Sequence, residues 1–265
     1  MTTARDLLVR GLLAGLLAGI AAFVVAYAVG EPSLSAAVAL EDSAGGHTNG
    51  TDEAGSGSTE DHDHGTAGAT EVPRSLQATV GLATATLVAG VTLGGLIGVV
   101  SALAMGRFGR LGARGVPLLV AGLGFVVTYL VPFLAYPPNP PAVGEAGTLG
   151  YRTALYFLLV AISLVAGVTA VLVGRRAAAR WGAWYATLAC AAAYVVVVGL
   201  AISLMPGYDE VPEGFPASLL HQFRQASLLV QVTLWGVLGL VLAELAHRLA
   251  ARGARTDRSR ALVDA

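Results

Sequence analysis

The sequence predicts an all-α fold, a polytopic membrane helix bundle of about six transmembrane helices with both termini in the cytoplasm. Three observations predict it: an apolar composition, apolar runs of membrane-spanning length, and separation of arginine from the acidic residues. The 265 residues are 55% hydrophobic and 12% charged, with a mean hydropathy of +0.69. Soluble domains are about 25% charged, so a water-soluble core cannot hide this much apolar surface.

Six stretches are long enough to cross a bilayer. A hydrocarbon core of roughly 30 Å requires a helix of about 20 apolar residues. The stretches cover residues 7–29, 76–105, 116–136, 153–173, 184–205 and 227–245. Pro216 suits the first turn of a helix, so we expect the last helix to begin outside the bilayer and to cover 217–249.

These spans divide the chain into four parts. Residues 1–29 form the cytoplasmic N-terminus and first transmembrane helix, and 30–75 form an acidic, histidine-containing flexible outer loop. Residues 76–249 form a membrane bundle of five helices, and 250–265 form a cytoplasmic arginine-rich tail. The outer loop is rich in Gly, Ser, Thr, Asp and Glu, and this composition cannot bury enough apolar area to fold independently.

The orientation follows from the arginines, because short cytoplasmic loops carry an excess of positive charge. All 16 basic residues are arginine, and thirteen lie in the N-terminus, residues 106–115, residues 174–182 and the tail. The other side holds Arg74, Arg152 and Arg224, together with thirteen of the 17 acidic residues. Both termini are therefore expected in the cytoplasm, which requires an even number of spans and favours six over five.

Several classes of chemistry are not expected. The chain has no lysine, so it lacks the P-loop and Schiff-base lysines of other enzymes and pumps. An ATP-driven step would need another subunit. The single Cys190 forms no disulfide or CxxC metal site, and no carboxylate lies near the centre of a span. We therefore expect that the protein is not an enzyme. We expect no permanently bound cofactor and no nucleic-acid partner.

Two spans carry glycines at a repeated GxxxG spacing, which lets helices approach closely. We expect the two faces to pack on each other, although glycines are also common in membrane helices without such a role. The glycines are Gly11, Gly15 and Gly19 in the first span and Gly90, Gly94 and Gly98 in the second. A second reading of the first span is a cleaved signal peptide, since Ala26-Tyr27-Ala28 fits a cleavage pattern.

The first outer loop contains candidate metal ligands, namely His47, Asp61, His62, Asp63 and His64. Imidazole suits Co, Ni, Cu and Zn ions, and a flexible loop can wrap a cation without a preformed cage. The sequence predicts weak, exchangeable metal capture here. The alternative is a solvated acidic linker in which three histidines occur by chance, because no fixed zinc-ligand spacing is present.

The other two outer loops supply a second group of candidates. Four prolines around Asn139 predict a stiff lip, and Glu145 and Arg152 at its far side could pair at the mouth of a cavity. The last helix carries His221, Arg224, Gln225 and Gln231 near one face. Polar groups entering a membrane usually face the bundle interior, so they serve either as structural hydrogen-bonding groups or as part of an ion path.

Three stretches resemble the CbtA family of proposed cobalt transporter subunits: EPSLSAAVALED, YPPNPPAVGEAGTLGYRTALY and LLHQFRQASL. The resemblance implies transport of Co²⁺, with Ni²⁺ as an alternative, and cobalamin biosynthesis as the setting. It also implies a small single-span, histidine-rich partner subunit beside the lipid bilayer. Within this likeness His47, His62 and His64 are the matching candidates for metal capture. This chain departs from the family pattern in two respects. The resemblance implies five spans where the charge pattern favours six, and it implies a first loop denser in histidine.

Overall fold

The structure is a computed structural model that describes residues 4–46, 73–108 and 111–263. All regular structure in these ranges is helical, and six helices are long and apolar enough to span a membrane. They cover Ala4–Ser43, Arg74–Ala104, Gly115–Ala135, Leu149–Trp181, Ala183–Leu204 and Ala217–Arg255. The predicted all-α membrane bundle of six spans is confirmed.

Three of the spans contain a π-helical turn between two α-helical pieces. The first consists of α1 (Ala4–Val25), η1 (Ala26–Gly30) and α2 (Glu31–Gly46). The second consists of α3 (Arg74–Leu76), η3 (Gln77–Gly81) and α4 (Leu82–Ala104). The third consists of α5 (Gly115–Phe125), η4 (Val126–Leu130) and α6 (Val131–Ala135).

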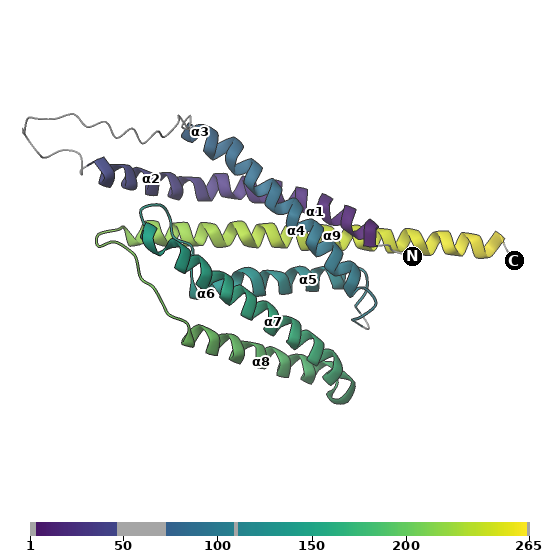
Figure 1. Cartoon of the computed structure of the whole chain (residues 1–265). Coiled ribbons are helices and arrows are strands. Elements are labelled where there is room, and N and C mark those ends of the chain that lie inside the picture. The colour runs from purple at the N-terminus through teal and green to yellow at the C-terminus, as the bar shows by residue number, and fades with distance from the viewer. Residues whose placement is uncertain (1–3, 47–72, 109–110, 264–265) are drawn as a thin grey trace, which may run out of the picture.

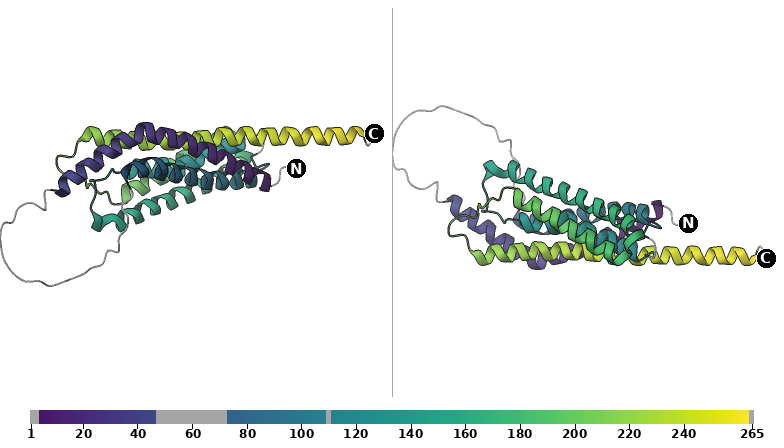
Figure 2. Two further views of the ribbon diagram at one scale, coloured as in Figure 1. Left: turned by 90° about the horizontal axis from the view of Figure 1, so that it is seen from above. Right: turned by 90° about the horizontal axis from the view of Figure 1, so that it is seen from below.

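The remaining three spans are uninterrupted. A short 3₁₀ turn, η5 (Ala146–Thr148), leads into α7 (Leu149–Trp181), which turns at Gly182 into α8 (Ala183–Leu204). Gly182 has a φ of 80°, a left-handed conformation that glycine adopts at little cost. The last helix, α9 (Ala217–Val263), has 47 residues and extends well beyond the others at its C-terminal end (Figures 1 and 2).

The helices extend further than the sequence predicted. Helix α2 occupies the first part of the predicted flexible loop, and α7 includes the arginines assigned to a 174–182 loop. Helix α9 likewise continues through most of the predicted tail. The added segments are rich in Ala, Leu and Arg, which are strong helix formers. An apolar run therefore marks the part of a helix that lies in the bilayer, and not its ends.

The bundle is assembled around α1 and α9. Helix α1 packs between α4 and α9, α5 packs on α9, and α7 packs against η4 and α6 and carries α8 on its other side. The central core consists of Ala14, Ala18, Ala22, Ile97, Ala121, Leu234, Trp235, Leu238 and Leu242. Three of these belong to α1, and this central position favours a retained first span over a cleaved signal peptide.

The glycine faces of α1 and α4 do pack on each other, as predicted. A Cβ atom built on Gly15 would overlap the carbonyl oxygen of Gly90 and lie 3.0 Å from the Cα of Gly94. One built on Gly11 would overlap the carbonyl oxygen of Gly94 and lie 3.0 Å from the Cα of Gly98. The two backbones are therefore in direct contact, and no larger side chain fits between them.

The two ends of the bundle differ in charge. Both termini and the turns at 105–114 and 182 lie at one end, whereas the 136–148 and 205–216 loops lie at the other (Figure 1). We call the first the arginine end, because it carries Arg114, Arg175 and Arg248, and the second the acidic end, because it carries Glu31 and Glu210. Both termini thus share one end, as the charge pattern predicted.

Candidate functional site

A cavity of about 320 Å³ lies at the acidic end, enclosed by the first, second, third and last spans. Apolar side chains form most of its wall, and four polar ones interrupt it. We call it the Glu31 cavity, and it is lined by Ala26, Gly30, Glu31, Leu34, Leu82, Tyr129, Pro138, Phe223, Ala226, Ser227, Val230 and Gln231. A few convergent polar groups in an apolar concavity are typical of a ligand site.

Two of the π-helical turns line this cavity, and the helix that follows the third contributes to it. Ala26 and Gly30 belong to η1, Tyr129 belongs to η4, and Leu82 directly follows η3. Prolines follow two of these turns, Pro32 after η1 and Pro132 after η4. A proline has no N–H and its ring clashes with the carbonyl four residues earlier, so a widened turn lets the helix continue. Such turns occur frequently at functional sites.

Glu31 is the carboxylate of this cavity and it is paired. Arg74 Nη2 donates to Glu31 Oε1 at 2.6 Å, and the Ser35 hydroxyl donates to the same oxygen at 2.9 Å. The Glu31 side chain is 14% exposed and the Arg74 side chain 36%. The ion pair therefore joins the first and second spans at the edge of the cavity, and Glu31 is its more buried member.

Tyr129 also lines the cavity. Its hydroxyl is buried and makes no hydrogen bond within the part of the chain that the structure describes. Because the hydroxyl oxygen is inaccessible to solvent, it is packed within the wall and does not face the open space of the cavity.

A polar cluster holds the two loops of the acidic end together, and we call it the Arg152 clamp. It consists of Glu145, Thr148, Arg152, Tyr208 and Glu210. Arg152 Nη1 lies 3.3 Å from Glu210 Oε2, and the Thr148 hydroxyl donates to Glu210 Oε1 at 2.6 Å. The Glu145 amide also donates to Glu210, at 2.9 Å. Tyr208 lies under the Arg152 guanidinium, whose Cζ is 5.9 Å from the ring centroid.

These contacts lower the pKa of Glu210. The Thr148 hydrogen bond contributes most, followed by the Glu145 amide and the charge of Arg152. The predicted pair of Glu145 with Arg152 takes a different form, because Arg152 Nη2 donates to the main-chain carbonyl of Glu145 at 3.1 Å. The carboxylate partner of Arg152 is Glu210, which belongs to a loop that the sequence could not place beside it.

The proline loop is shaped around the same arginine. Gly144 has a φ of 110°, and a Cβ atom built on it would lie 2.9 Å from Arg152 Cζ. Pro140 is fully buried, and the Tyr136 hydroxyl donates to the carbonyl of Pro206 at 2.9 Å. The loop is thus a packed cap on the acidic end.

The other site residues predicted from the sequence fall into two groups, those that contact the loop or the cavity and those that do not. Arg224 Nη2 donates to Asn139 Oδ1 at 2.9 Å, which ties the start of α9 to the proline loop. Gln231 lines the Glu31 cavity. His221 and Gln225 lie on the exposed side of α9, away from the bundle interior where polar groups of a span usually lie.

The predicted metal-capture residues His47, Asp61, His62, Asp63 and His64 lie outside the described residues. Elsewhere, the described ranges contain no group of three His, Cys, Asp or Glu side chains able to hold a metal ion. Sequence reasoning missed the roles of Glu31 and Tyr129. Their signal was a glutamate-proline pair directly after the first span and a second proline three residues after Tyr129.

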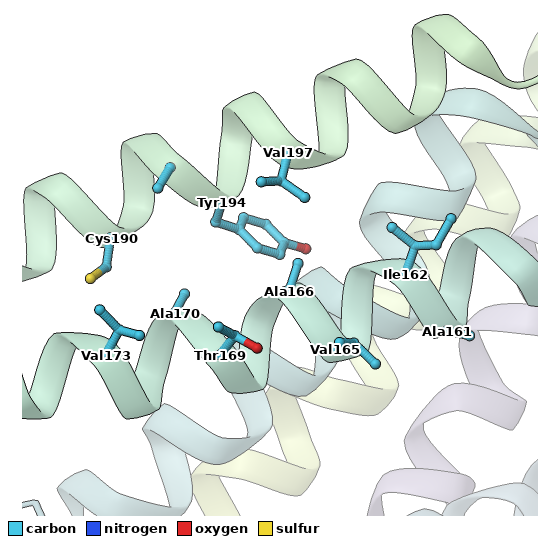
Figure 3. A pocket seen from close by; sticks show the side chains of 11 residues that line it. Ala161, Ile162, Val165, Ala166, Thr169, Ala170, Val173, Cys190, Tyr194 and Val197 are labelled. Atoms are coloured by element: carbon cyan, nitrogen blue, oxygen red, sulfur yellow. The ribbon is translucent and has the colours of Figure 1, made fainter.

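A second, larger cavity of about 590 Å³ lies between α7 and α8 and differs in character. Figure 3 shows Cys190, Tyr194 and Val197 of α8 facing Val165, Ala166 and Thr169 of α7 across it. The wall is almost wholly apolar, and Tyr194 is hydrogen-bonded to Ser163 at 2.8 Å. It is an open apolar gap along α7 and α8, and it lacks the convergent polar groups of the Glu31 cavity.

Six helices that are long and apolar enough to span a membrane define a multi-pass membrane protein. The chain matches the family model of CbtA, probable cobalt transporter subunit, over residues 4–247. It belongs to this family, as its sequence resemblance indicated. The comparisons with curated proteins and with solved structures find no match.

Proposed function

We propose that this protein is the membrane subunit of an uptake system for Co²⁺ in the cytoplasmic membrane, with Ni²⁺ as an alternative cargo. The family match over 4–247 carries the proposal. The charge asymmetry supports an orientation with the arginine end inside. The acidic end then faces the outside, where its carboxylates raise the local concentration of cations.

Capture begins in the tract that precedes α3. His47, Asp61, His62, Asp63 and His64 offer the imidazole and carboxylate ligands that divalent transition metals prefer. The packed loops of the acidic end, tied by the Arg152 clamp and by Asn139 with Arg224, form a mouth at the end of the bundle where α2 ends and α3 begins. A small single-span, histidine-rich subunit is the partner that would deliver metal to the same end.

The membrane potential supplies a driving force for entry. Moving two positive charges through ~100 mV is worth roughly 4.6 kcal/mol, at about 2.3 kcal/mol per charge. Uptake therefore needs no nucleotide hydrolysis, which agrees with a chain that contains no lysine for a phosphate-binding loop.

Cobalt accumulation in cells with and without the gene tests the proposal. Cells that carry the gene should accumulate more Co²⁺ under cobalt limitation, and deletion of residues 45–66 should reduce the difference. Equal accumulation with and without the gene would sink the transport function.

A non-transporting scaffold or metal-delivery partner is the second candidate, since the family description names a subunit. Reconstitution separates the two. The purified protein in liposomes should admit Co²⁺ when an inside-negative potential is imposed, whereas a scaffold gives no flux.

A further inference from the structure

We infer that the Glu31 cavity is a transit site for a hydrated divalent cation, and that the cation enters by displacing Arg74 from the Glu31 carboxylate. The inference rests on the proposed function and adds to it a site within the bundle. Neither residue is among the candidates that the sequence supplied, and the site does not involve the histidine-containing tract.

The size of the cavity suits an ion that keeps its water. At roughly 30 Å³ per water molecule, about 320 Å³ holds roughly ten molecules. A cation with a first shell of six waters fits with room to spare. A bare ion would not be held, because the described residues offer no cluster of three strong ligands.

The wall supplies hydrogen-bonding groups for such a shell. Glu31, Ser227 and Gln231 line the cavity from α2 and α9. Coordinated waters donate strongly, and carboxylate, hydroxyl and amide oxygens accept. Outer-shell contacts of this kind bind weakly, and weak binding is what permits an ion to leave again.

Arg74 acts as a tethered substitute for the cation. Its guanidinium neutralises Glu31 in the structure at 2.6 Å. A divalent ion that takes its place keeps the carboxylate compensated, so the buried charge is never left unpaired. Arg74 is the more exposed member of the pair and begins α3 directly after Pro73. Its Nε is buried without a hydrogen-bond partner among the described residues, so Arg74 must turn outward for the cation to replace it.

The inference predicts opposite effects for the two partners of the ion pair. Glu31→Gln keeps the shape of the side chain and removes its charge, so Co²⁺ binding should weaken about tenfold or more. Arg74→Gln removes the competitor, so Co²⁺ binding should tighten about two- to fivefold, the scale of a partly exposed ion pair. A purely structural ion pair would give no tightening in Arg74→Gln.

The experiment is equilibrium dialysis of the full-length purified protein against CoCl₂ at constant NaCl concentration, with no other divalent cation present. Glu41→Gln is the matched control, because Glu41 lies on the same helix α2 and is exposed outside the cavity. A Glu31→Gln protein that binds Co²⁺ as Glu41→Gln does overturns the inference. If Glu31→Gln fails to fold, Arg74→Gln alone tests the inference. A Kd for Co²⁺ that is unchanged or raised in Arg74→Gln overturns the inference.

Separate measurements test the proposed site and the proposed transport function. Wild-type protein that gives no Co²⁺ flux in liposomes would contradict the proposed function, while the dialysis series still tests the site. Wild-type protein that transports Co²⁺ with no effect of Glu31→Gln on flux or Kd would contradict the site and leave the proposed function standing.

Discussion

The α1–α4 pair and the α7–α8 hairpin are both antiparallel helix pairs of a membrane bundle, yet they are held in different ways. The first pair is joined backbone to backbone through glycine. The second encloses an apolar gap of about 590 Å³. In the most apolar stretch of the second span 39% of the residues are buried, against 6% in α8. Close packing therefore fixes one pair along its length, and the hairpin depends on contacts elsewhere.

The hairpin is anchored at the acidic end. Arg152 stands at the start of α7 and Glu210 in the loop that follows α8, so the Arg152 clamp ties both arms of the hairpin to each other and to the proline loop. Polar contacts at one end replace the continuous contact that glycine provides for α1 and α4. The two regions should therefore respond differently to the same kinds of substitution.

The largest effect is expected for Gly15→Leu in the glycine contact. The side chain would meet the backbone of α4, which cannot yield as a flexible side chain can, so the loss should exceed about 3 kcal/mol. Thermal unfolding in detergent measures it. Gly94→Leu should behave alike.

The matched control lies in the other region. Gly199 on α8 has nothing within 4 Å of a built Cβ atom, so Gly199→Leu should leave the melting curve almost unchanged. Equal losses for Gly15→Leu and Gly199→Leu would remove the distinction between the two pairs.

Gly144→Ala should have the next largest effect. Its φ of 110° is unfavourable for alanine, and the added methyl group would displace the Arg152 guanidinium. A cost of about 1–3 kcal/mol is expected. Hydrogen exchange should show faster opening at the start of α7 and little change in α1 and α4. Gly147→Ala, where nothing lies within 4 Å, is the control.

The sequence was sufficient for the six spans and for the glycine contact, because hydropathy and GxxxG spacing are properties of single segments. It could not supply the ion pairs. Glu31 with Arg74 and Arg152 with Glu210 join residues 43 and 58 positions apart, and which loops meet depends on how the helices pack. The sequence did not predict the π-helical turns either, because a proline in a span indicates a break or kink as readily as a widened turn.

The clamp should also respond to pH. The pKa of Glu210 is lowered in the folded protein from its ordinary value of 4.5, so its contribution is complete above about pH 4.5. The contribution is lost as the pH falls through the lowered folded-state value. Glu210→Gln should melt below wild type at pH 7, and the two melting temperatures should converge once the pH falls below the lowered folded-state pKa of Glu210. A constant difference down to that pH would show that Glu210 does not anchor the hairpin through its charge.

The smallest effect is expected inside the hairpin itself. Tyr194, which lines the apolar gap (Figure 3), forms with Ser163 a hydrogen bond of 2.8 Å that crosses from α8 to α7. Tyr194→Phe removes the hydroxyl group and should cost about 1 kcal/mol, because Ser163 is buried and loses its partner. Ser163→Ala should cost a similar amount, and the double variant should cost no more than either alone if the bond is their only coupling. A double-mutant cycle in detergent measures this. A loss from Tyr194→Phe as large as that from Gly15→Leu would mean that the hairpin is fixed along its length after all, and that the Arg152 clamp is not its principal anchor.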